Sequence, residues 1–495
     1  MVKILNNSPL AGGSKPKFLE LALLLGIFLG LNWLIISFFM PSSKPQPAQI
    51  NNDVIPRLDR GTSSAPIEIK SENIELTQTG DRISNVRLLK YHDGAKPVEL
   101  LANPGEFIEF GLVGGGEFTK TISISEDYVI SVRIKSKGNA APYARIARDG
   151  GKKSSMMLMT SAGGLANIDG NTKRESWGNI SDKSAVWGGG ANSFVGFEDQ
   201  YWQTLVQIDS GVPGPRTLRM KNIGGDRFQA DISADAASDF TFNIYAGPKS
   251  QKILNAANPA MPGVAQTIDY GWFSFLSRPF LWSLTALHDL VGNYGLAIII
   301  LTLIIRILMI PLTKKSYKSM AAMQKMQPEM QRIQKLYKDD RARLQQEMMR
   351  LYQTTKVSPM SGCLPMLLQI PIFFALYRAL IIAVEMRDSS FLWIRDLAAA
   401  DPTNILNLFG LLPFAPPSFL PAIGILPILM GATMWLQMKM SSNANAATPG
   451  MGFMKWMPVV FVVLFAGLPA GLVLYWTVSN IFGIAQQYYI KKSLR

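Results

Sequence analysis

One arginine lies deep inside an apolar stretch of the sequence. Arg306 falls within residues 294–312, which are otherwise almost entirely apolar. A helical rise of 1.5 Å per residue places it about 18 Å beyond residue 294 and about 9 Å before residue 312. Burying an arginine at that depth in a bilayer costs about 2.5 to 3.5 kcal/mol unless it meets a partner, water or a thinned membrane. Two explanations stay open: the side chain reaches the cytoplasmic headgroups, or it serves a wet site.

Polar residues in the neighbouring apolar runs could line such a wet site. Thr302 lies one helical turn from Arg306 on the same face. The other runs contribute Gln369, Gln437, Tyr475, Thr477, Ser479 and Asn480. Because these runs contain no Asp or Glu, Arg306 has no obvious internal carboxylate. Its charge would therefore attract acidic or polar segments of an incoming polypeptide.

The composition restricts the class of protein. Of the 495 residues, 48% are hydrophobic and only 17% are charged, below the roughly 25% that is usual for soluble domains. The net charge of +14 fits a nucleic-acid partner, anionic lipid or basic cytoplasmic loops. The single Cys363 excludes an intramolecular disulfide, and His92 and His288 lie far apart in the sequence. Phosphate-loop and nucleophile-elbow motifs are missing, so we expect no enzyme, no metal or other cofactor and no nucleotide.

The N-terminal part of the chain predicts an anchor and a linker. Residues 18–40 form an apolar run long enough to cross about 30 Å of hydrocarbon. This run exceeds the apolar core of about 7 to 15 residues in a signal peptide. We therefore expect an uncleaved anchor with residues 1–17 in the cytoplasm; a cleaved signal peptide is the alternative. Residues 41–66 are rich in Pro, Ser, Gln and Asn and predict a linker.

An extracytoplasmic β-domain should follow. Residues 67–265 alternate apolar and polar side chains in short runs, such as 118–124, and are interrupted by glycine-rich turns, such as 114–116. This pattern predicts an antiparallel β-sandwich. Its aromatic stretch, residues 194–202, is either buried packing or a groove for a sugar or peptide.

The remainder predicts a helical membrane protein. Residues 269–291 place Trp and Phe at helical spacing among polar residues, which indicates a helix lying on the outer membrane surface. Pro469-Ala470-Gly471 should divide the last apolar run into two helices; one long tilted helix is the alternative. The expected segments are crossings at 294–312, 362–384, 421–438, 457–468 and 472–489, a cytoplasmic helical hairpin at 313–359, external segments at 385–420 and 469–471, a cytoplasmic loop at 439–456 and a cytoplasmic tail at 490–495.

Charge and methionine patterns support this arrangement. Residues 314–357 contain eleven Lys or Arg and four acidic residues, whereas residues 385–420 contain two Arg and four acids. Basic residues are enriched in cytoplasmic loops. Apolar residues at helical spacing around the break at 338–340 predict the two helices of the hairpin. Its methionines could bind varied apolar partners, or they could form the hairpin core: Met323, Met326, Met330, Met348 and Met349.

Ordered motifs across residues 269–487 resemble those of the YidC membrane insertases. The matching runs are Asp269-Tyr270-Gly271-Trp272, Ile310-Pro311-Leu312-Thr313, Gly362-Cys363-Leu364-Pro365, Gln369-Ile370-Pro371-Ile372 and Pro469-Ala470-Gly471-Leu472-Val473-Leu474-Tyr475-Trp476. The anchor and sandwich match the Gram-negative form more loosely. The resemblance implies an α-helical polytopic protein with an N-terminal anchor, a five-helix core, a periplasmic antiparallel β-supersandwich and a cytoplasmic helical hairpin.

The resemblance also implies the function of an insertase and membrane chaperone of the inner membrane, working alone or with the Sec translocon. Expected partners are nascent inner-membrane proteins and membrane lipids, with the ribosome and the signal recognition particle receptor as further candidates. A hydrophilic groove open to cytoplasm and lipid should contain Arg306, Thr302, Gln369, Gln437, Tyr475, Trp476, Ser479 and Asn480. A hydrophobic guide for the substrate should contain Pro371, Phe374, Met366, Val459 and Phe461. The hairpin methionines should recruit substrate.

Some features depart from the family pattern, and two other functions are alternatives. Trp476 stands where many relatives carry a second Tyr, and the tail at 490–495 is short. The loop at 401–420 is extended and apolar, with no evident role. A transporter would need internal repeats, which the C-terminal helices lack. A membrane-tethered carbohydrate enzyme would need paired carboxylates or a histidine in the sandwich.

Overall fold

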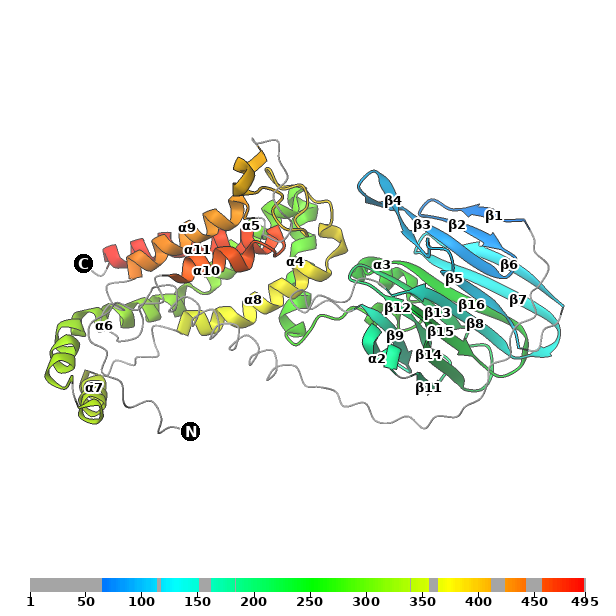
Figure 1. The fold of residues 1–495 in the computed structure, drawn as a ribbon, viewed down its shortest axis with the longest axis horizontal. Coiled ribbons are helices and arrows are strands. Elements are labelled where there is room, and N and C mark those ends of the chain that lie inside the picture. Colours follow the sequence, from blue (N-terminus) through cyan, green and yellow to red (C-terminus); the bar gives the residue numbers. More distant parts are fainter. Residues whose placement is uncertain are drawn as a thin grey trace. The chain divides into compact units, whose positions relative to one another are not determined.

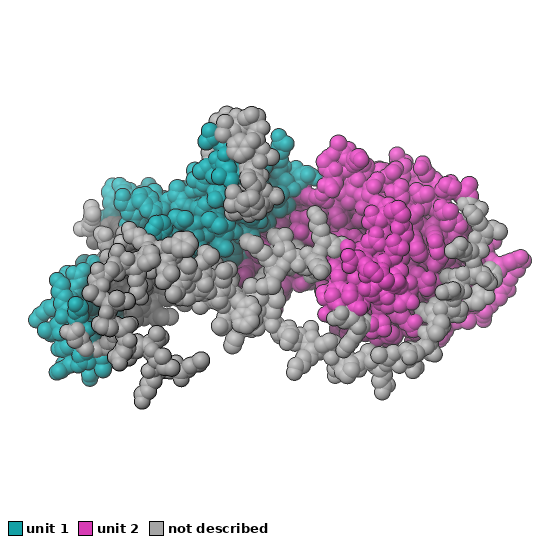
Figure 2. All heavy atoms as spheres, in the orientation of Figure 1, with its two compact units in different colours: residues 1–45, 283–373, 388–495 teal, residues 46–282, 374–387 magenta. Residues whose placement is uncertain are grey.

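The computed structural model describes residues 65–113, 117–150, 162–182, 184–338, 340–355, 364–410, 423–441 and 456–493. They form two compact units (Figures 1 and 2): residues 283–373 with 388–495, and the β-domain with residues 374–387. The predicted cytoplasmic N-terminus, the anchor and nearly all of the linker lie outside the described residues. So does most of the predicted loop at 439–456.

The β-domain contains two antiparallel sheets, as the alternating pattern predicted (Figure 1). A nine-stranded sheet has the order β1-β2-β3-β5-β8-β15-β14-β11 with β4 beside β3, and a seven-stranded sheet has the order β10-β9-β12-β13-β16-β7-β6. The strands are β1 Ile67–Lys70, β2 Ile74–Thr79, β3 Arg82–Asp93, β4 Lys96–Leu100, β5 Phe107–Leu112, β6 Phe118–Ile124, β7 Val129–Ala140, β8 Pro142–Asp149, β9 Gly163–Ile168, β10 Asn171–Ser176, β11 Ala185–Gly189, β12 Phe194–Glu198, β13 Trp202–Ile208, β14 Arg216–Gly224, β15 Arg227–Ser233 and β16 Ala237–Pro248.

The core of this domain comes from side chains that alternate along the strands. In β3, Ile83, Val86 and Leu88 are fully buried. Phe110 of β5 meets Phe242 of β16, with 6.3 Å between ring centroids, so the two sheets share one apolar core. Burying such side chains stabilises a fold by about 1.5 to 3 kcal/mol each.

The aromatic stretch at 194–202 belongs to this buried packing. Phe194 and Phe197 are fully buried and Trp202 is almost so. Of the two alternatives left open by the sequence, buried packing is therefore confirmed. Short helices complete the domain: α2 Trp177–Asp182, α3 Gln251–Ala257 and the 3-10 turn η1 Val264–Gln266.

Helices dominate the rest of the described chain. They are α4 Ser274–Val291, α5 Tyr294–Leu308, α6 Ile310–Leu336, α7 Arg341–Thr355, α8 Leu364–Ile382, α9 Ile425–Ser441, α10 Met457–Phe465 and α11 Ala470–Ser493, with 3-10 turns η3 Val384–Met386 and η4 Ile405–Gly410. In the first unit α11 packs against both α5 and α9, and α10 packs on α9 (Figure 1).

Several helix boundaries differ from the sequence prediction, and two of these differences change how the segments are arranged. The surface helix begins at Ser274, five residues later than predicted, because Asp269 accepts a hydrogen bond from the N–H of Gly271 at 2.8 Å and forms a turn there. Gly271 has φ +71°, a conformation that favours glycine. The predicted crossing at 294–312 instead ends at Leu308, and α6 continues from Ile310.

The chain bends by 58° between α5 and α6. Pro311 sits in the first turn of α6, where its missing N–H costs least. Across the described ranges, no helix taken singly has both the length and the hydropathy needed to cross a bilayer. The bent pair Tyr294–Leu308 and Ile310–Ser319 reaches that length and hydropathy together.

The last apolar run contains two helices, because α10 ends at Phe465 and α11 begins at Ala470. The alternative of one long tilted helix is therefore wrong. The first N–H groups of α11 find protein acceptors: Ala470 donates to the carbonyl of Ala399 at 2.7 Å, and Gly471 donates to that of Leu397 at 2.9 Å. A helix start leaves such donors without partners inside the helix, and the loop that contains Leu397 and Ala399 supplies the acceptors.

Candidate functional site

Arg306 lies in the last turn of α5 and reaches α11. Its Nε donates a hydrogen bond to the Oγ of Ser479 at 2.7 Å. The side chain is half-buried. The titratable groups that act on it within the described residues are the tyrosines Tyr475 and Tyr317, not carboxylates. Among the described residues no carboxylate is paired with Arg306, so no acidic side chain there neutralises its positive charge.

Tyr475 extends this contact to a third helix. Its hydroxyl hydrogen-bonds Ser479, one turn further along α11, and it accepts a hydrogen bond from the Nε2 of Gln369 on α8. Side chains four residues apart share a helix face, which is why Tyr475 and Ser479 both face Arg306. A continuous polar chain thus joins α5, α11 and α8.

Tyr317 is a member of this site that sequence reasoning missed. It lies on α6 and interacts electrostatically with Arg306. Residues on one helix can be related by their spacing, but α5 and α6 are bent by 58°. Spacing along a straight helix could not have placed Tyr317.

Thr302 lies one turn before Arg306, as predicted, but its hydroxyl is used within its own helix. Oγ1 donates to the carbonyl of Ile298 at 2.6 Å, and the side chain is buried. Thr477 does the same on α11, donating to Val473 at 2.8 Å. Such bonds leave the hydroxyl oxygen only as an acceptor.

Two predicted groove residues lie at the contact between α9 and α11. The Nδ2 of Asn480 donates to the Oγ1 of Thr433 at 3.2 Å. Gln437 packs over Gly483, where an added Cβ would lie 2.9 Å from its Nε2. Consecutive helical residues diverge by about 100°, so Ser479 and Asn480 occupy different faces of α11. The functional role of Gln437 and Asn480 stays a prediction.

An aromatic cluster joins α8, α10 and α11 next to the polar chain. Trp476 lies 5.2 Å from Phe373, 5.2 Å from Phe465 and 5.8 Å from Phe461, measured between ring centroids. Trp476 and Phe461 were predicted site residues, whereas Phe373 and Phe465 were missed. We name the rings of Trp476, Phe373, Phe465 and Phe461 the aromatic cluster. Val459, another predicted guide residue, is exposed on α10.

The other predicted guide residues are distributed differently. Pro371 is half-buried on α8, two residues before Phe373. Phe374 belongs to the other compact unit, where its ring stacks on that of Phe273 at 6.4 Å. The Met366 side chain lies outside the described part of the structure.

The hairpin methionines divide by burial. Met330 is 4% exposed and packs as core, whereas Met349 is 53% exposed. Met326 and Met348 are half-buried, and the Met323 side chain lies outside the described residues. Of the two explanations left open by the sequence, packing in the hairpin core fits Met330. Binding of apolar partners fits Met349, because its side chain is exposed.

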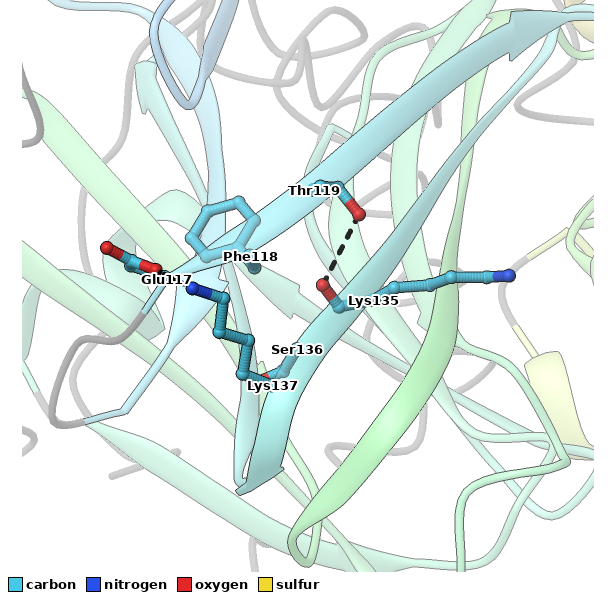
Figure 3. Close-up of a pocket in the computed structure, with 6 residues that line it drawn as sticks. All are labelled: Glu117, Phe118, Thr119, Lys135, Ser136 and Lys137. Atoms are coloured by element: carbon cyan, nitrogen blue, oxygen red, sulfur yellow. Dashed lines mark hydrogen bonds and ion pairs between the residues drawn. The ribbon is translucent and has the colours of Figure 1, made fainter.

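A surface recess of about 590 Å³ lies between β6 and β7 of the β-domain (Figure 3). Glu117 and Lys137 pair across it, and Thr119 donates to the carbonyl of Lys135 at 3.5 Å. None of the predicted site residues lies there. The polar chain in the helical unit is therefore the candidate site.

Comparison with known proteins covers both parts of the chain. A family model described as 60Kd inner membrane protein matches residues 286–495, and one described as YidC periplasmic domain matches residues 113–283. The chain is 35% identical to the membrane protein insertase YidC of Sinorhizobium fredii, covering 84% of this chain and 80% of that protein. It is 38% identical to the same-named protein of Rickettsia conorii, covering 76% and 70%.

Solved structures give weaker matches. An active YidC insertase with its first transmembrane domain resolved is 17% identical, with a TM-score of 0.37, covering 86% of this chain and 95% of that one. YidC from Thermotoga maritima is 16% identical, with a TM-score of 0.30. The sequence matches therefore decide the relationship.

Proposed function

This chain belongs to the YidC family of membrane protein insertases, and from that premise we propose that it moves its substrates through a groove centred on Arg306. It is an inner-membrane protein with a periplasmic domain, and it acts on inner-membrane proteins. The groove opens to the cytoplasm and to lipid, and its polar wall is the chain Arg306, Ser479, Tyr475 and Gln369.

The hydrogen bond from Arg306 to a neutral hydroxyl supports this groove most directly. Ser479 orients the guanidinium without cancelling its charge. A cation at that depth lowers the free energy of an acidic or polar segment that enters beside it, because opposite charges attract strongly where the dielectric is low. Arg306 therefore holds the polar tail of a substrate transiently, while water in the groove shortens the hydrocarbon distance that the tail must cross.

The aromatic cluster and the exposed Val459 guide the apolar helix of the substrate. The rings of the cluster contact one another across α8, α10 and α11 beside the polar chain, Val459 is exposed on α10, and Pro371 lies two residues before Phe373 on α8. The substrate helix gains about 0.3 to 0.6 kcal/mol for each Leu-like residue that enters lipid. This gain drives insertion, so no nucleotide is consumed.

The helices α6 and α7 receive substrate on the cytoplasmic side. We assign them to an antiparallel hairpin, with Met349 as an exposed apolar contact and Met330 in its core. The full topology has an N-terminal anchor and five further crossings, with both termini in the cytoplasm. The Sec translocon, the ribosome, the signal recognition particle receptor and membrane lipids are the proposed partners, and the short tail contributes little to ribosome binding.

Insertion into reconstituted vesicles tests the groove. The substrates are two single-spanning proteins that differ only in whether their translocated tail is acidic or neutral. Arg306→Ala should lower the insertion of the acidic-tailed substrate by about tenfold, since a charge contact in such a site is worth about 1.4 kcal/mol or more. Arg306→Lys keeps the charge and should retain most of the activity.

Arg133→Ala is the matched control. Arg133 is an exposed arginine of β7 that pairs with Asp239 at 2.7 Å, in the β-domain and outside both the proposed groove and the hairpin. It should leave insertion of both substrates unchanged. Wild-type insertion of the acidic-tailed substrate by Arg306→Ala would disprove the groove model, as would equal losses for both arginines.

A further inference from the structure

The second part of α8 belongs to the same compact unit as the β-domain. Residues 374–387 cluster with the β-strands, whereas residues 364–373 of the same helix cluster with the other helices. Three separate contacts hold this second part on the β-domain.

The first contact is a two-pronged ion pair. The Nη2 of Arg378 lies 2.7 Å from Oδ2 of Asp269, and its Nε donates to the Asp269 carbonyl at 2.9 Å. Arg378 is only 8% exposed. A paired guanidinium in this geometry fixes orientation as well as distance.

The segment that carries Asp269 is itself tied to the seven-stranded sheet. Arg174 of β10 binds the carboxylate of Glu198 at 2.7 Å and also donates to the carbonyl of Thr267. Lys249 binds the other oxygen of Glu198 at 2.8 Å, and both side chains of this pair are buried. Asp269 is therefore a fixed point of the β-domain and not the end of a loose linker.

The second and third contacts lie further along the chain. Gln200 donates from Nε2 to the carbonyl of Ile381 at 3.1 Å. Arg387 lies 3.0 Å from Asp93 at the end of β3, and its guanidinium covers the rings of Tyr201 and Trp202 at 5.9 and 5.5 Å. These contacts extend the hold from Arg378 to the end of η3.

The first part of α8 carries residues of the proposed groove. Gln369 bonds Tyr475, and Phe373 contacts Trp476. Pro371 lies between them, and α8 continues as one helix through it. Because the helix is continuous, the position at which the β-domain holds α8 after Phe373 determines how Gln369 and Phe373 contact α11.

We propose that Asp269, Arg378 and Arg387 are positioning residues for insertion. Through these three residues the β-domain holds α8 in place, and we call this set of contacts the mount. The mount keeps Gln369 and Phe373 of α8 aligned with Tyr475 and Trp476 of α11. This inference rests on the proposed function, because it assigns a role to the groove wall that α8 supplies.

Thiol crosslinking in the full chain tests the mount. Gln369→Cys and Tyr475→Cys are combined in a Cys363→Ser background, and the yield of the 369–475 crosslink formed in vesicles by a bifunctional thiol reagent reports the alignment of α8 with α11. Gln369 and Tyr475 meet through the ends of two long side chains, so the reagent has to span more than a direct disulfide would. Adding Arg378→Met, or the milder Arg387→Met, should lower that yield. The expected loss for Arg378→Met is about tenfold, the effect of removing a hydrogen-bonded charge. Insertion is measured separately in chains that keep Gln369 and Tyr475, and it should fall in parallel.

Arg133→Met is the matched control, because Arg133 pairs with Asp239 on the exposed sheet surface. It should change neither the yield nor insertion. An unchanged crosslinking yield in folded Arg378→Met and Arg387→Met chains overturns the proposal, whatever their insertion rates. Arg306→Ala should lower insertion without changing the yield. The experiments therefore distinguish an error in the role given to Arg306 from an error in the role given to the mount.

Discussion

The Nε of Arg306 donates a hydrogen bond to the Oγ of Ser479 at 2.7 Å, and this joins α5 to α11 through a neutral acceptor. A carboxylate at the same place would bind the guanidinium as an ion pair. A hydroxyl fixes its direction and leaves its charge available to a third group. The choice of acceptor at residue 479 therefore determines how strongly Arg306 can attract a substrate.

Ser479→Asp should block this attraction. The new carboxylate would pair with Arg306, and we expect insertion of an acidic-tailed substrate to fall about tenfold while a neutral-tailed substrate is less affected. Ser479→Ala is the matched control and should have a smaller effect, since it removes the hydrogen bond but retains the free charge. Both are measured by protease protection in reconstituted vesicles. Equal insertion by Ser479→Asp and the wild type would contradict the role of the charge.

The hydrogen bond between Gln369 and Tyr475 should be measurable as a coupling free energy. In a double-mutant cycle of Gln369→Leu and Tyr475→Phe, we expect the two losses of unfolding free energy to be non-additive by about 0.6 to 1.7 kcal/mol, the range of such bonds inside membranes. Reversible unfolding in bicelles gives the four values. Tyr489→Phe, at an exposed ring, is the control and should show no coupling with Gln369→Leu. Additive losses in the cycle of Gln369→Leu and Tyr475→Phe would mean that the bond between Gln369 and Tyr475 does not join α8 to α11.

Asp401 should stabilise the start of α9. This buried carboxylate accepts from the N–H of Leu426 at 2.8 Å, from the N–H of Thr403 at 3.0 Å and from Trp393 Nε1 at 3.4 Å. Asp401→Ala leaves these donors without partners and should cost about 2 to 3 kcal/mol. The melting temperature in detergent measures the loss. Asp340→Ala should cost less, because Asp340 is exposed and accepts from the N–H of Arg343 at 3.0 Å; a larger loss there would refute this assignment.

The ion pair of Asp269 and Arg378 should give an acid-dependent contribution to stability. Burial alone would raise the pKa of Asp269, but the nearby Arg378 and the Gly271 N–H outweigh it, so this pKa is lowered. A lowered pKa means that the contribution is fully present above about pH 4, the usual pKa of an unfolded Asp. It is lost as the pH falls through the folded-state pKa.

The difference in melting temperature between the wild type and Arg378→Met should therefore be largest above about pH 4 and should shrink below it. In strong acid both proteins lack the carboxylate charge, so they should melt more nearly alike. Scanning calorimetry at a series of pH values gives this difference. A difference that stays constant down to the lowest pH would show that the charge of Asp269 contributes nothing.

Gly196 should tolerate no side chain. An added Cβ would lie 2.0 Å from the carbonyl oxygen of Thr204 and 2.8 Å from the Cα of Leu205, both backbone atoms of β13. Gly196→Ala should therefore destabilise the β-domain by about 3 kcal/mol or more. Gly188→Ala is the matched control, because a Cβ there has open space. Urea unfolding followed by tryptophan fluorescence compares them; equal midpoints would contradict the close packing of β12 on β13.

Local patterns predicted much of the fold. Alternation of apolar residues predicted the two sheets, and Pro469 predicted the break before α11, because both signals act over a few residues. The start of α4 and the bend at Met309 were missed. The turn at Asp269 and Gly271 needs a specific hydrogen bond, and Pro311 was included in an apolar run although it begins a new helix.

The candidate site was predicted as a set of residues but not as an arrangement. Arg306, Ser479 and Tyr475 were grouped correctly as neighbours, whereas Asn480 lies on another face of α11. Membership in a spanning segment does not fix the rotation of a helix, which depends on its packing partners. The pairing of Asp269 with Arg378, 109 residues apart, carries no local signal at all.

The carbonyls of Ala399 and Leu397 that cap the start of α11 bear on the electrical tightness of the membrane. They accept the N–H groups of Ala470 and Gly471, which would otherwise recruit water at that end of the helix. In the topology and the wet groove proposed above, these bonds lie on the outer side of the membrane and leave protons no continuous path. Polypeptides would then enter the bilayer from one side while the cell keeps its ion gradients.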